Sequence, residues 1–311
     1  MDSIAERRKQ SYKEYSQLTF TDDFLFCKIM ASDPDLCRRV AETVIGRKIS
    51  RIGSVTIQNA VTPDAESKGV RFDVFFADEE GTLYDIEMQT ASVGNLPKRI
   101  RYYQALMDLD TLDKGEDYQA LRKSCIAFIC LFDAFGQGLP QYTFKETCQE
   151  LPSLLMNDGT EKVFFCATNK TASHSESAEQ GAFLRYLLGK RSEGGIVTDL
   201  EQAVQRARQN EPWRKQYMTL SEIKAKEYIE GHKDGIKLGL EQGLQKGLQK
   251  GREEGLLSGL ERGRNNMLNG MLTAFKMSRQ PIESAYELIR LNPECQSVTL
   301  EDLRKIWDEL A

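Results

Sequence analysis

The chain has 311 residues, of which 40 % are hydrophobic and 29 % charged, and its formal net charge at pH 7 is −5. These values are typical of a soluble globular protein, and the negative balance excludes a general electrostatic attraction to nucleic acid. No apolar run reaches the length of about 18 residues that a membrane helix needs. The polar start, Met1 to Lys9, lacks the apolar segment of a secretory signal, so we expect neither a membrane span nor export.

The first two-thirds of the chain predict a mixture of helices and strands. A helix is expected to open at Asp22-Asp23, and a second to run from Pro34 to about Ile45, where Gly46 ends it. The sequence also predicts a strand at 52–59, a helix at 97–113, strands at 124–132, 142–148 and 163–168, and short helices at 181–190 and 200–209. The apolar run 124–132 is typical of a central strand covered on both faces, and the mixture indicates an α/β sandwich.

Segments 70–77 and 83–89 both have strand character and flank the turn residues 78–82, so they predict a β-hairpin. A turn centred on Glu80 places Asp73 directly opposite Glu87, with Cβ atoms about 5 Å apart. Two carboxylates at this distance repel each other unless a cation lies between them. Because hard cations such as Mg²⁺ prefer oxygen ligands, the hairpin predicts a metal site.

The alternative is an ordinary amphipathic hairpin whose acidic residues face solvent. Strand alternation argues against it, because it assigns the acidic residues and the apolar ones to opposite faces. The face with Glu87 also carries Asp85 and Gln89; the apolar face is expected to hold Phe72, Val74, Phe76, Tyr84, Ile86 and Met88. Since Arg71 and Phe75 flank Asp73, the acidic face is not a simple solvated charge strip.

The seven cysteines indicate the cellular compartment, and the two histidines limit the kinds of catalytic site that are expected. The cysteines are scattered, odd in number and without a C-x-x-C pair, which favours free thiols in a reducing cytoplasm. His174 and His232 lie in polar segments and are expected at the surface. A zinc site of histidine and cysteine, or a histidine-dependent hydrolase, is therefore disfavoured relative to carboxylate and metal chemistry.

Beyond about residue 217 a long helix is expected, and glycine recurs in it at every fourth position from Gly231 to Gly263. Leucine or isoleucine follows most of these glycines. At about 100° per residue, a period of four drifts about 40° per repeat, and each glycine costs about 0.8–1 kcal/mol relative to alanine. Two interpretations stay open: a spacer, or close helix–helix packing in a homo-oligomer through residues 229–265. Two short helices, at 281–291 and 300–310, are expected to close the chain.

Four segments that occur in order carry a family resemblance. They are Thr21-Asp22-Asp23-Phe24-Leu25-Phe26, Arg71-Phe72-Asp73-Val74, Asp85-Ile86-Glu87-Met88-Gln89 and Lys98-Arg99-Ile100-Arg101-Tyr102-Tyr103. Their order and spacing resemble the Rpn (recombination-promoting nuclease) and transposase family of the PD-(D/E)XK nuclease superfamily, over about residues 17–300. The resemblance implies a restriction-endonuclease-like fold, a mixed central sheet flanked by helices, with an all-helical C-terminal extension that contains the glycine repeat.

The resemblance also implies roles for the hairpin residues. Asp73 and Glu87 match the metal-binding acids, for Mg²⁺ or alternatively Mn²⁺ or Ca²⁺. Gln89 takes the place of the superfamily's lysine, and a neutral amide can only orient or hydrogen-bond a reactant. Water activation would then depend on the metal. Asp22 or Asp23 is expected as a plain N-cap or as an outer ligand.

On the helix that follows the hairpin, Arg99, Arg101 and Tyr103 are expected either to hold a DNA backbone or to form a solvated face. The sequence thus predicts a cytoplasmic, metal-dependent DNA endonuclease that hydrolyses phosphodiesters in a recombination or transposition context. The alternative is a catalytically silent binding module with the nuclease fold. The expected divisions are a nuclease-like domain (1–170), a helical extension (171–228), the glycine-repeat helix or spacer (229–265) and a small helical end (266–311).

Overall fold

The computed structural model describes residues 13–61, 68–175 and 177–310. The chain divides into two compact units, Met1–Ala225 and Lys226–Ala311. The strands of the first unit are β1 (Thr56–Val61), β2 (Val70–Ala77), β3 (Leu83–Gln89), β4 (Ser124–Cys130), β5 (Gln141–Phe144) and β6 (Thr160–Cys166). Its helices are α2 (Asp23–Ser32), α3 (Pro34–Ile45), α4 (Leu96–Thr111), α5 (Asn169–Ser173), α6 (Ala178–Leu187), α7 (Gly195–Arg208) and the start of α8 (Glu211–Met277), with 3-10 turns η1 (Tyr15–Gln17) and η2 (Tyr118–Ala120).

The six strands form one mixed sheet in the order β1-β2-β3-β4-β6-β5. The central pairs β3–β4 and β4–β6 are parallel, whereas β1, β2 and β5 run antiparallel to their neighbours. A mixed sheet flanked by helices is the restriction-endonuclease-like α/β architecture, so the predicted fold class is confirmed. The parallel strands β3, β4 and β6 end together at one edge of the sheet.

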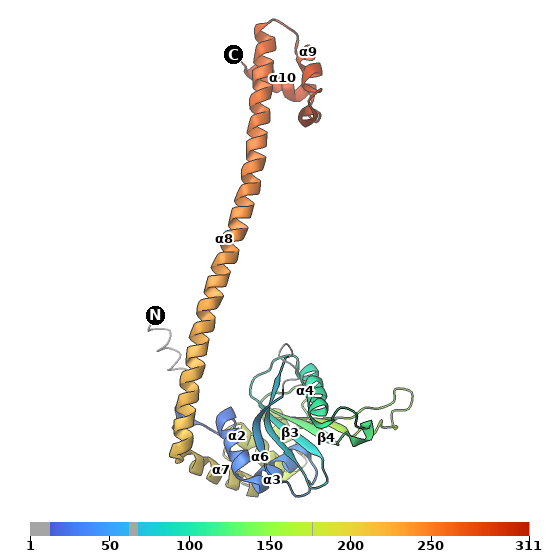
Figure 1. Ribbon diagram of the computed structural model, residues 1–311, viewed down its shortest axis with the longest axis vertical. Helices are drawn as coiled ribbons and strands as arrows, with labels where there is room; N and C mark the ends of the chain where they lie inside the picture. The colour runs from blue at the N-terminus through green and yellow to red at the C-terminus, as the bar shows by residue number, and fades with distance from the viewer. Residues whose placement is uncertain (1–12, 62–67, 176, 311) are drawn as a thin grey trace. The chain divides into compact units, whose positions relative to one another are not determined.

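Helices cover the two faces of the sheet unequally (Figure 1). One face packs against α4, and the other against α2, α3, α6 and α7. β4 is buried over its whole length, with Ile126 and Phe128 under α4 and Cys125 and Ala127 on the opposite side. The apolar run therefore forms the central strand that the sequence predicts, because both of its faces are covered.

Local signals set the ends of α3. The Asp33 side chain accepts a hydrogen bond from the Leu36 N–H, and Pro34 occupies the first turn, where its missing N–H costs nothing. The helix ends at Gly46, whose φ of 80° is a left-handed conformation that glycine adopts without strain. The predicted bounds of this helix are confirmed.

The pairing of β1 with β2 is interrupted at one position. Gln58 has a φ of 52°, and the register resumes beyond it with Asn59 opposite Phe72. Beside this position, Phe72 belongs to the core under α4, whereas Val74 belongs to the core under α2 and α3. The prediction that Phe72 shares a face with Val74 and Phe76 is therefore wrong, because regular alternation breaks at Asp73 between them.

Two predicted strands are shorter than expected. β1 begins at Thr56 rather than at Ile52, which makes only an isolated bridge to Asp78. β5 ends at Phe144 rather than at Cys148. Within the described part of the chain, none of the helices combines the length and the apolar character that a membrane crossing requires.

The second unit contains most of α8 together with α9 (Ile282–Ile289), η3 (Pro293–Cys295) and α10 (Leu300–Glu309). Its small core is formed by Leu268, Leu272, Ala285, Ile289, Cys295 and Leu303. The Thr299 side chain caps α10 reciprocally with Asp302.

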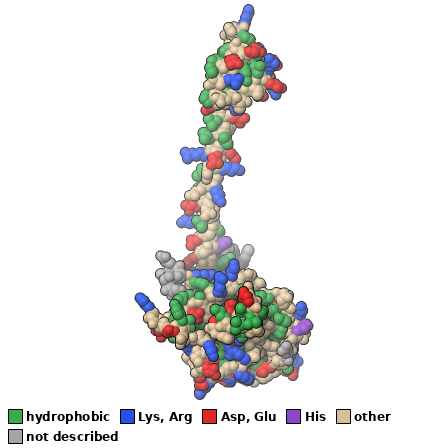
Figure 2. All heavy atoms as spheres, turned by 90° about the vertical axis from the view of Figure 1, so that its right-hand side faces the viewer, with side chains coloured by type: hydrophobic (Ala, Val, Ile, Leu, Met, Phe, Trp, Pro, Cys, Tyr) green, Lys and Arg blue, Asp and Glu red, His purple; other side chains and the backbone are tan. Residues whose placement is uncertain are grey.

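The glycine repeat is helical and lies inside α8. Added Cβ atoms at Gly231 and Gly263 would meet nothing within 4 Å, and Leu240 and Leu248 are 76 % and 66 % exposed. Figure 2 shows apolar and charged side chains following one another along this segment. The leucines of the repeat are therefore covered by no other part of the described chain.

Candidate active site

The backbone pairing of the hairpin β2–β3 ends next to Asp73 and Glu87, and we call this end of the hairpin, with its carboxylates, the acidic fork. Regular pairing reaches Val74 and Ile86, a register that puts Asp73 opposite Glu87 as the turn geometry predicts. At the fork the Asp73 N–H donates to Glu87 Oε1 at 2.9 Å, and the Met88 N–H donates to Asp73 Oδ2 at 3.3 Å. Carboxylate oxygens thus replace backbone carbonyls as acceptors, which fixes the two side chains close together.

The acidic face is buried rather than solvated, because α4 covers it. Glu87 is 1 % exposed and Asp85, two residues earlier on the same face of β3, is fully buried. Both carboxylate oxygens of Asp85 lack a hydrogen-bond partner among the described residues. The alternative interpretation, in which the acidic residues of the hairpin face solvent, is therefore wrong for Asp85 and Glu87.

Burial and mutual repulsion raise the pKa of all three carboxyls. Desolvation and then the charge of Asp23 raise the pKa of Asp73 to about 6. Desolvation and then Asp73 raise the pKa of Glu87 to about 8, and desolvation followed by Glu87 raises that of Asp85 well above its usual range. The protein surroundings therefore do not compensate the negative charge that full ionisation of the three carboxyls would create, and the metal-free cluster retains protons instead.

Arg99, for which the sequence predicts either contact with a DNA backbone or exposure to solvent, enters this cluster from α4. Its Nη2 donates to Glu87 Oε2 at 2.7 Å, and its Nη1 donates to Gln89 Oε1 at 2.7 Å. The guanidinium also donates to the Tyr103 hydroxyl and lies over the rings of Tyr103 and Phe128. Arg99 and Tyr103 therefore belong to the acidic site itself.

The remaining two predicted residues are placed differently. The Gln89 amide is engaged on both sides, since its Nε2 donates to the Ala91 carbonyl at 2.7 Å while its Oε1 faces Arg99. Arg101 is exposed on α4 and, two residues from Arg99, it lies on a different face of that helix. The structure thus gathers Asp73, Glu87, Gln89, Arg99 and Tyr103 but leaves Arg101 outside.

The first turn of α2 separates the two expected aspartates. Asp22 is the N-cap residue; its carboxylate accepts from the Thr19 N–H and pairs with Lys13 at 2.7 Å, outside the acidic fork. Asp23 instead lies beside Asp73, and Arg71 is 3.9 Å from it. Of the two, only Asp23 is placed to act as the expected outer ligand.

Cys27 is a member of this group that the sequence reasoning missed. Its Sγ donates to Asp23 Oδ1 at 3.6 Å and to the Asp73 backbone carbonyl at 3.5 Å, and one ligand atom from each of these three side chains lies within 4.8 Å of the others. Burial raises the pKa of the Cys27 thiol, so it is neutral in the absence of a metal ion. The spacing of four between Asp23 and Cys27, which puts both on one helix face, is the signal that could have indicated it.

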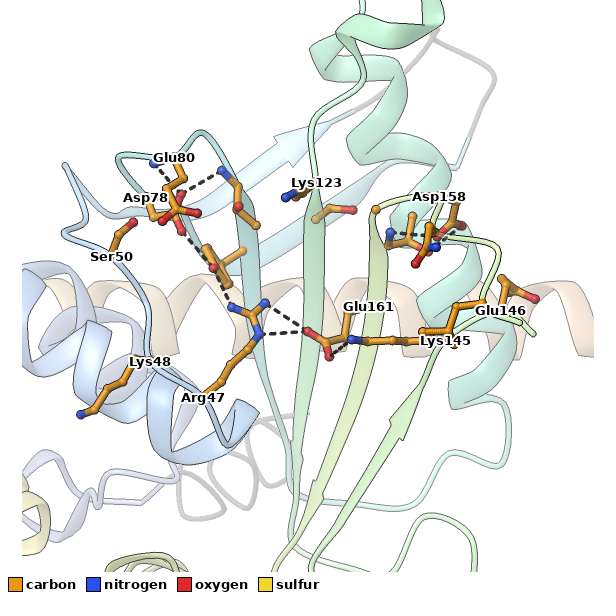
Figure 3. Close-up of a pocket in the computed structure, with 17 residues that line it drawn as sticks. Arg47, Lys48, Ser50, Asp78, Glu80, Lys123, Lys145, Glu146, Asp158 and Glu161 are labelled. Carbon is orange, nitrogen blue, oxygen red and sulfur yellow. Dashed lines mark hydrogen bonds and ion pairs between the residues drawn. The ribbon is translucent and has the colours of Figure 1, made fainter. Parts of the chain in front are cut away.

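A separate pocket of about 590 Å³ lies at the opposite ends of β3, β4 and β6 (Figure 3). Some of its charged groups pair with one another: Glu161 lies between Arg47 and Lys145, and Tyr84 joins Arg47 to Asp78. None of the predicted site residues lines it. The buried acids Asp73, Asp85 and Glu87 do not line this pocket.

Comparison with known families identifies the domain that carries the acidic fork. Residues 21–164 match the family model described as PD-(D/E)XK nuclease family transposase, a span that begins just before α2 and includes β1 to β5 and most of β6. Comparisons with curated proteins and with solved structures found no match. The matched span contains every residue of the acidic fork and the whole of α4. Residues 21–164 of this chain are therefore similar to the PD-(D/E)XK nuclease family of transposases.

Proposed function

We propose that this protein is a metal-dependent DNA endonuclease that hydrolyses phosphodiester bonds at the fork between β2 and β3. The observation that supports this most is the fork itself, where two buried carboxylates, Asp73 and Glu87, are held side by side by backbone N–H groups. Similarity to a nuclease family gives the reaction class, and DNA is the substrate that the family implies.

The residues of the fork fit a divalent cation. Asp85 has both carboxylate oxygens buried without a partner among the described residues, and Arg99 is the cation that contacts Glu87. Three acids beside one guanidinium cannot all ionise without a further positive charge, which a hard cation would supply. Asp73 and Glu87 would hold it, and their oxygen ligands suit Mg²⁺, with Mn²⁺ or Ca²⁺ as alternatives.

The chain's own residues would then divide the work of phosphodiester hydrolysis. A cation bound here lowers the pKa of a coordinated water and polarises a phosphoryl oxygen. Gln89 orients the attacking water or the substrate through the remaining lone pair of Oε1. Arg99, hydrogen-bonded to Gln89, supplies beside that residue the positive charge that a lysine would carry at position 89.

DNA would reach the site along α4. Arg101 is exposed there and offers a guanidinium to a phosphate, while Arg99 is 32 % exposed even though it pairs with Glu87. Tyr103 is buried and orients Arg99 through its hydroxyl rather than by facing solvent. Arg101 is therefore proposed for backbone contact, with Arg99 and Tyr103 at the point of cleavage.

Cleavage of supercoiled plasmid in Mg²⁺ or Mn²⁺ tests the proposal with isosteric variants. Wild type should nick the plasmid only with the metal, and Asp73→Asn or Glu87→Gln should lose at least about a hundredfold in rate. Glu161→Gln is the matched control, because Glu161 is a sheet carboxylate outside the fork. Equal rates in all four proteins would remove the fork from the reaction.

One observation favours a second candidate, a catalytically silent binding module. Gln89 is neutral, and Arg99 already neutralises part of the charge on Glu87, so the site can persist without turnover. This candidate predicts that the protein binds DNA in a gel-shift assay, that no metal supports cleavage, and that calorimetry finds no Mg²⁺ or Mn²⁺ signal that Glu87→Gln removes.

The glycine repeat suggests how two such domains could act on one duplex. We propose that residues 229–265 pair with the same segment of a second copy, which would cover the exposed leucines Leu240, Leu244 and Leu248. Because the repeat drifts about 40° per step, the two helices must supercoil right-handedly to stay in contact. Replacing these leucines with serine should convert a dimer to a monomer in light scattering. If the wild type is already monomeric at micromolar concentration, the pairing is refuted and the segment is a spacer.

The proposed setting is a reducing cytoplasm, in a recombination or transposition reaction. All seven cysteines are free thiols, which supports that compartment, and the family description supports that reaction context.

A further inference from the structure

Two cysteines lie side by side where the parallel strands β4 and β6 end. Cys130 is the last residue of β4, Cys166 is the last residue of β6, and the strand register pairs them directly. Both side chains are fully buried, and both belong to the core on the α4 side of the sheet. Paired residues whose side chains share a face of a sheet are neighbours. The two thiols are therefore adjacent, although they are far apart in the sequence.

The spacing of the two strands meets the geometric requirement of a disulfide. Neighbouring strands lie about 4.8 Å apart, and the Cα atoms of a disulfide are usually about 4.4–6.8 Å apart. Its Cβ atoms are closer, at about 3.5–4.5 Å, so a bridge here would draw the two strand ends slightly together. Because such a deviation makes a disulfide easier to reduce, a bridge between Cys130 and Cys166 would be readily reversed.

The surroundings of the pair give its two sulfurs different roles. A hydrogen bond between the thiols lowers the pKa of Cys166 and raises that of Cys130. The Ala134 N–H donates to Cys166 Sγ at 3.5 Å and also lowers the pKa of that thiol. Since the thiolate is the nucleophile in disulfide exchange, Cys166 is the attacking sulfur and Cys130 the sulfur that closes the bridge.

The loop that follows β4 lies over this pair. Residues 131–137 are partly or fully exposed, and Ala134 among them contacts Cys166. The Asp133 carboxylate holds the loop, because it accepts hydrogen bonds from three backbone N–H groups of the loop and from the Tyr142 hydroxyl. Local opening of a surface loop needs less free energy than unfolding of a core, so a small oxidant can reach the thiols while the domain stays folded.

We propose that Cys130 and Cys166 form a reversible oxidation site, which closes to a disulfide on reaction with a small disulfide such as oxidised glutathione. The inference is independent of the proposed function, because neither thiol has a part in the proposed hydrolysis. Cys130 is also paired with Gln89 in the register of β3 and β4, so the bridge would form one strand away from the acidic fork.

The reaction proceeds in two exchanges. The Cys166 thiolate attacks one sulfur of the oxidant, which forms a mixed disulfide and releases one glutathione thiolate. Cys130 then attacks the Cys166 sulfur and releases the second glutathione. The protein pair gives up two electrons and its two thiol protons, and two molecules of reduced glutathione take them up.

Equilibration of the folded full chain in glutathione buffers of graded redox ratio tests the inference. After quenching in acid, free thiols are alkylated in denaturant and the digested protein is analysed by mass spectrometry. In wild type, Cys130 and Cys166 should lose alkylation in parallel as the buffer becomes more oxidising, appear as one disulfide-linked peptide pair, and recover in dithiothreitol. Both residues alkylated at every ratio, or a bridge from either one to another cysteine, would overturn the inference.

Cys125→Ser is the matched control, because Cys125 lies on the same strand and is equally buried but is paired with Glu161 rather than with a thiol. This variant should form the bridge as wild type does. Cys130→Ser should stop at a mixed disulfide of Cys166 with glutathione, and Cys166→Ser should leave Cys130 alkylated. The reverse pattern in these two variants would overturn the roles assigned to the two sulfurs.

Discussion

Glu87→Gln should make the metal-free protein more stable, although it removes a residue proposed for function. Glu87 is 1 % exposed and pairs with Arg99, but burial and Asp73 raise its pKa from 4.5 to about 8. A carboxyl that the unfolded chain ionises must therefore be largely protonated in the fold at pH 7. A neutral amide of the same shape does not have to take up a proton when the chain folds.

The size of the stabilisation follows from the difference between pH 7 and the ordinary pKa of the carboxyl. Protonating at pH 7 a carboxyl with an ordinary pKa of 4.5 costs about 3 kcal/mol, at about 1.4 kcal/mol per unit. The glutamine introduced at position 87 would place its NH₂ group against one of the two donors, the Asp73 N–H or Arg99, which costs about 1 kcal/mol. The net gain is about 1–2 kcal/mol, or about 2–6 °C in melting temperature for a unit of this size.

Thermal and urea unfolding after EDTA treatment measure this gain, with and without Mn²⁺. Saturation at about a hundred times Kd should stabilise wild type by about 2.7 kcal/mol and the variant much less. Glu161→Gln is the control for neutralising a sheet carboxylate, because Glu161 has two cations, Arg47 at 3.1 Å and Lys145 at 3.3 Å. Its loss should destabilise the protein whether or not metal is present.

The gain from Glu87→Gln should depend on pH in one direction. A raised carboxyl pKa favours the folded state below the unfolded value, and this contribution is lost as pH rises toward the folded value. The advantage of the variant should therefore be small at about pH 5 and largest near about pH 8–9. A variant that is as destabilised as Glu161→Gln in metal-free buffer at about pH 8 would refute the charge excess on which this expectation depends.

Three other outcomes are expected. In metal-free protein the free energy of unfolding should fall between about pH 5 and pH 9, because Asp73 and Glu87 hold protons that the unfolded chain releases; urea titrations that show a rise would contradict their raised pKa values of about 6 and about 8. Gln89→Lys should lower the melting temperature and not speed plasmid cleavage, since its ammonium would lie against Arg99, and faster cleavage would argue that Arg99 does not supply the cationic role. Arg101→Gln should reduce the slope of log affinity for DNA against log salt by about one and leave the melting temperature unchanged; an unaltered slope would make this helix face merely solvated.

Elements with strong local signals could be predicted from the sequence. The hairpin strands 70–77 and 83–89 have the predicted bounds, because a polar turn separates two short apolar-rich runs and fixes their register. The proline start and glycine end of α3 are equally local. The opposition of Asp73 and Glu87 follows from that register alone.

Features that depend on distant parts of the chain could not be predicted. The change of face between Phe72 and Val74 arises where Gln58 of β1 adopts a positive φ, and no local pattern at Phe72 reports it. Cys27 reaches the site only because α2 packs against the sheet. The pairing of Arg99 with Glu87, rather than with solvent, depends in the same way on where α4 lies over the sheet.

Anomalous diffraction from a crystal of the full chain soaked in Mn²⁺ tests most directly whether the fork binds metal. We expect one strong peak within coordination distance of carboxylate oxygens of both Asp73 and Glu87. The same soak of Glu87→Gln should weaken or remove that peak. An empty fork in wild type, with manganese bound instead beside Glu161 in the pocket at the opposite ends of the strands, would contradict the proposed site.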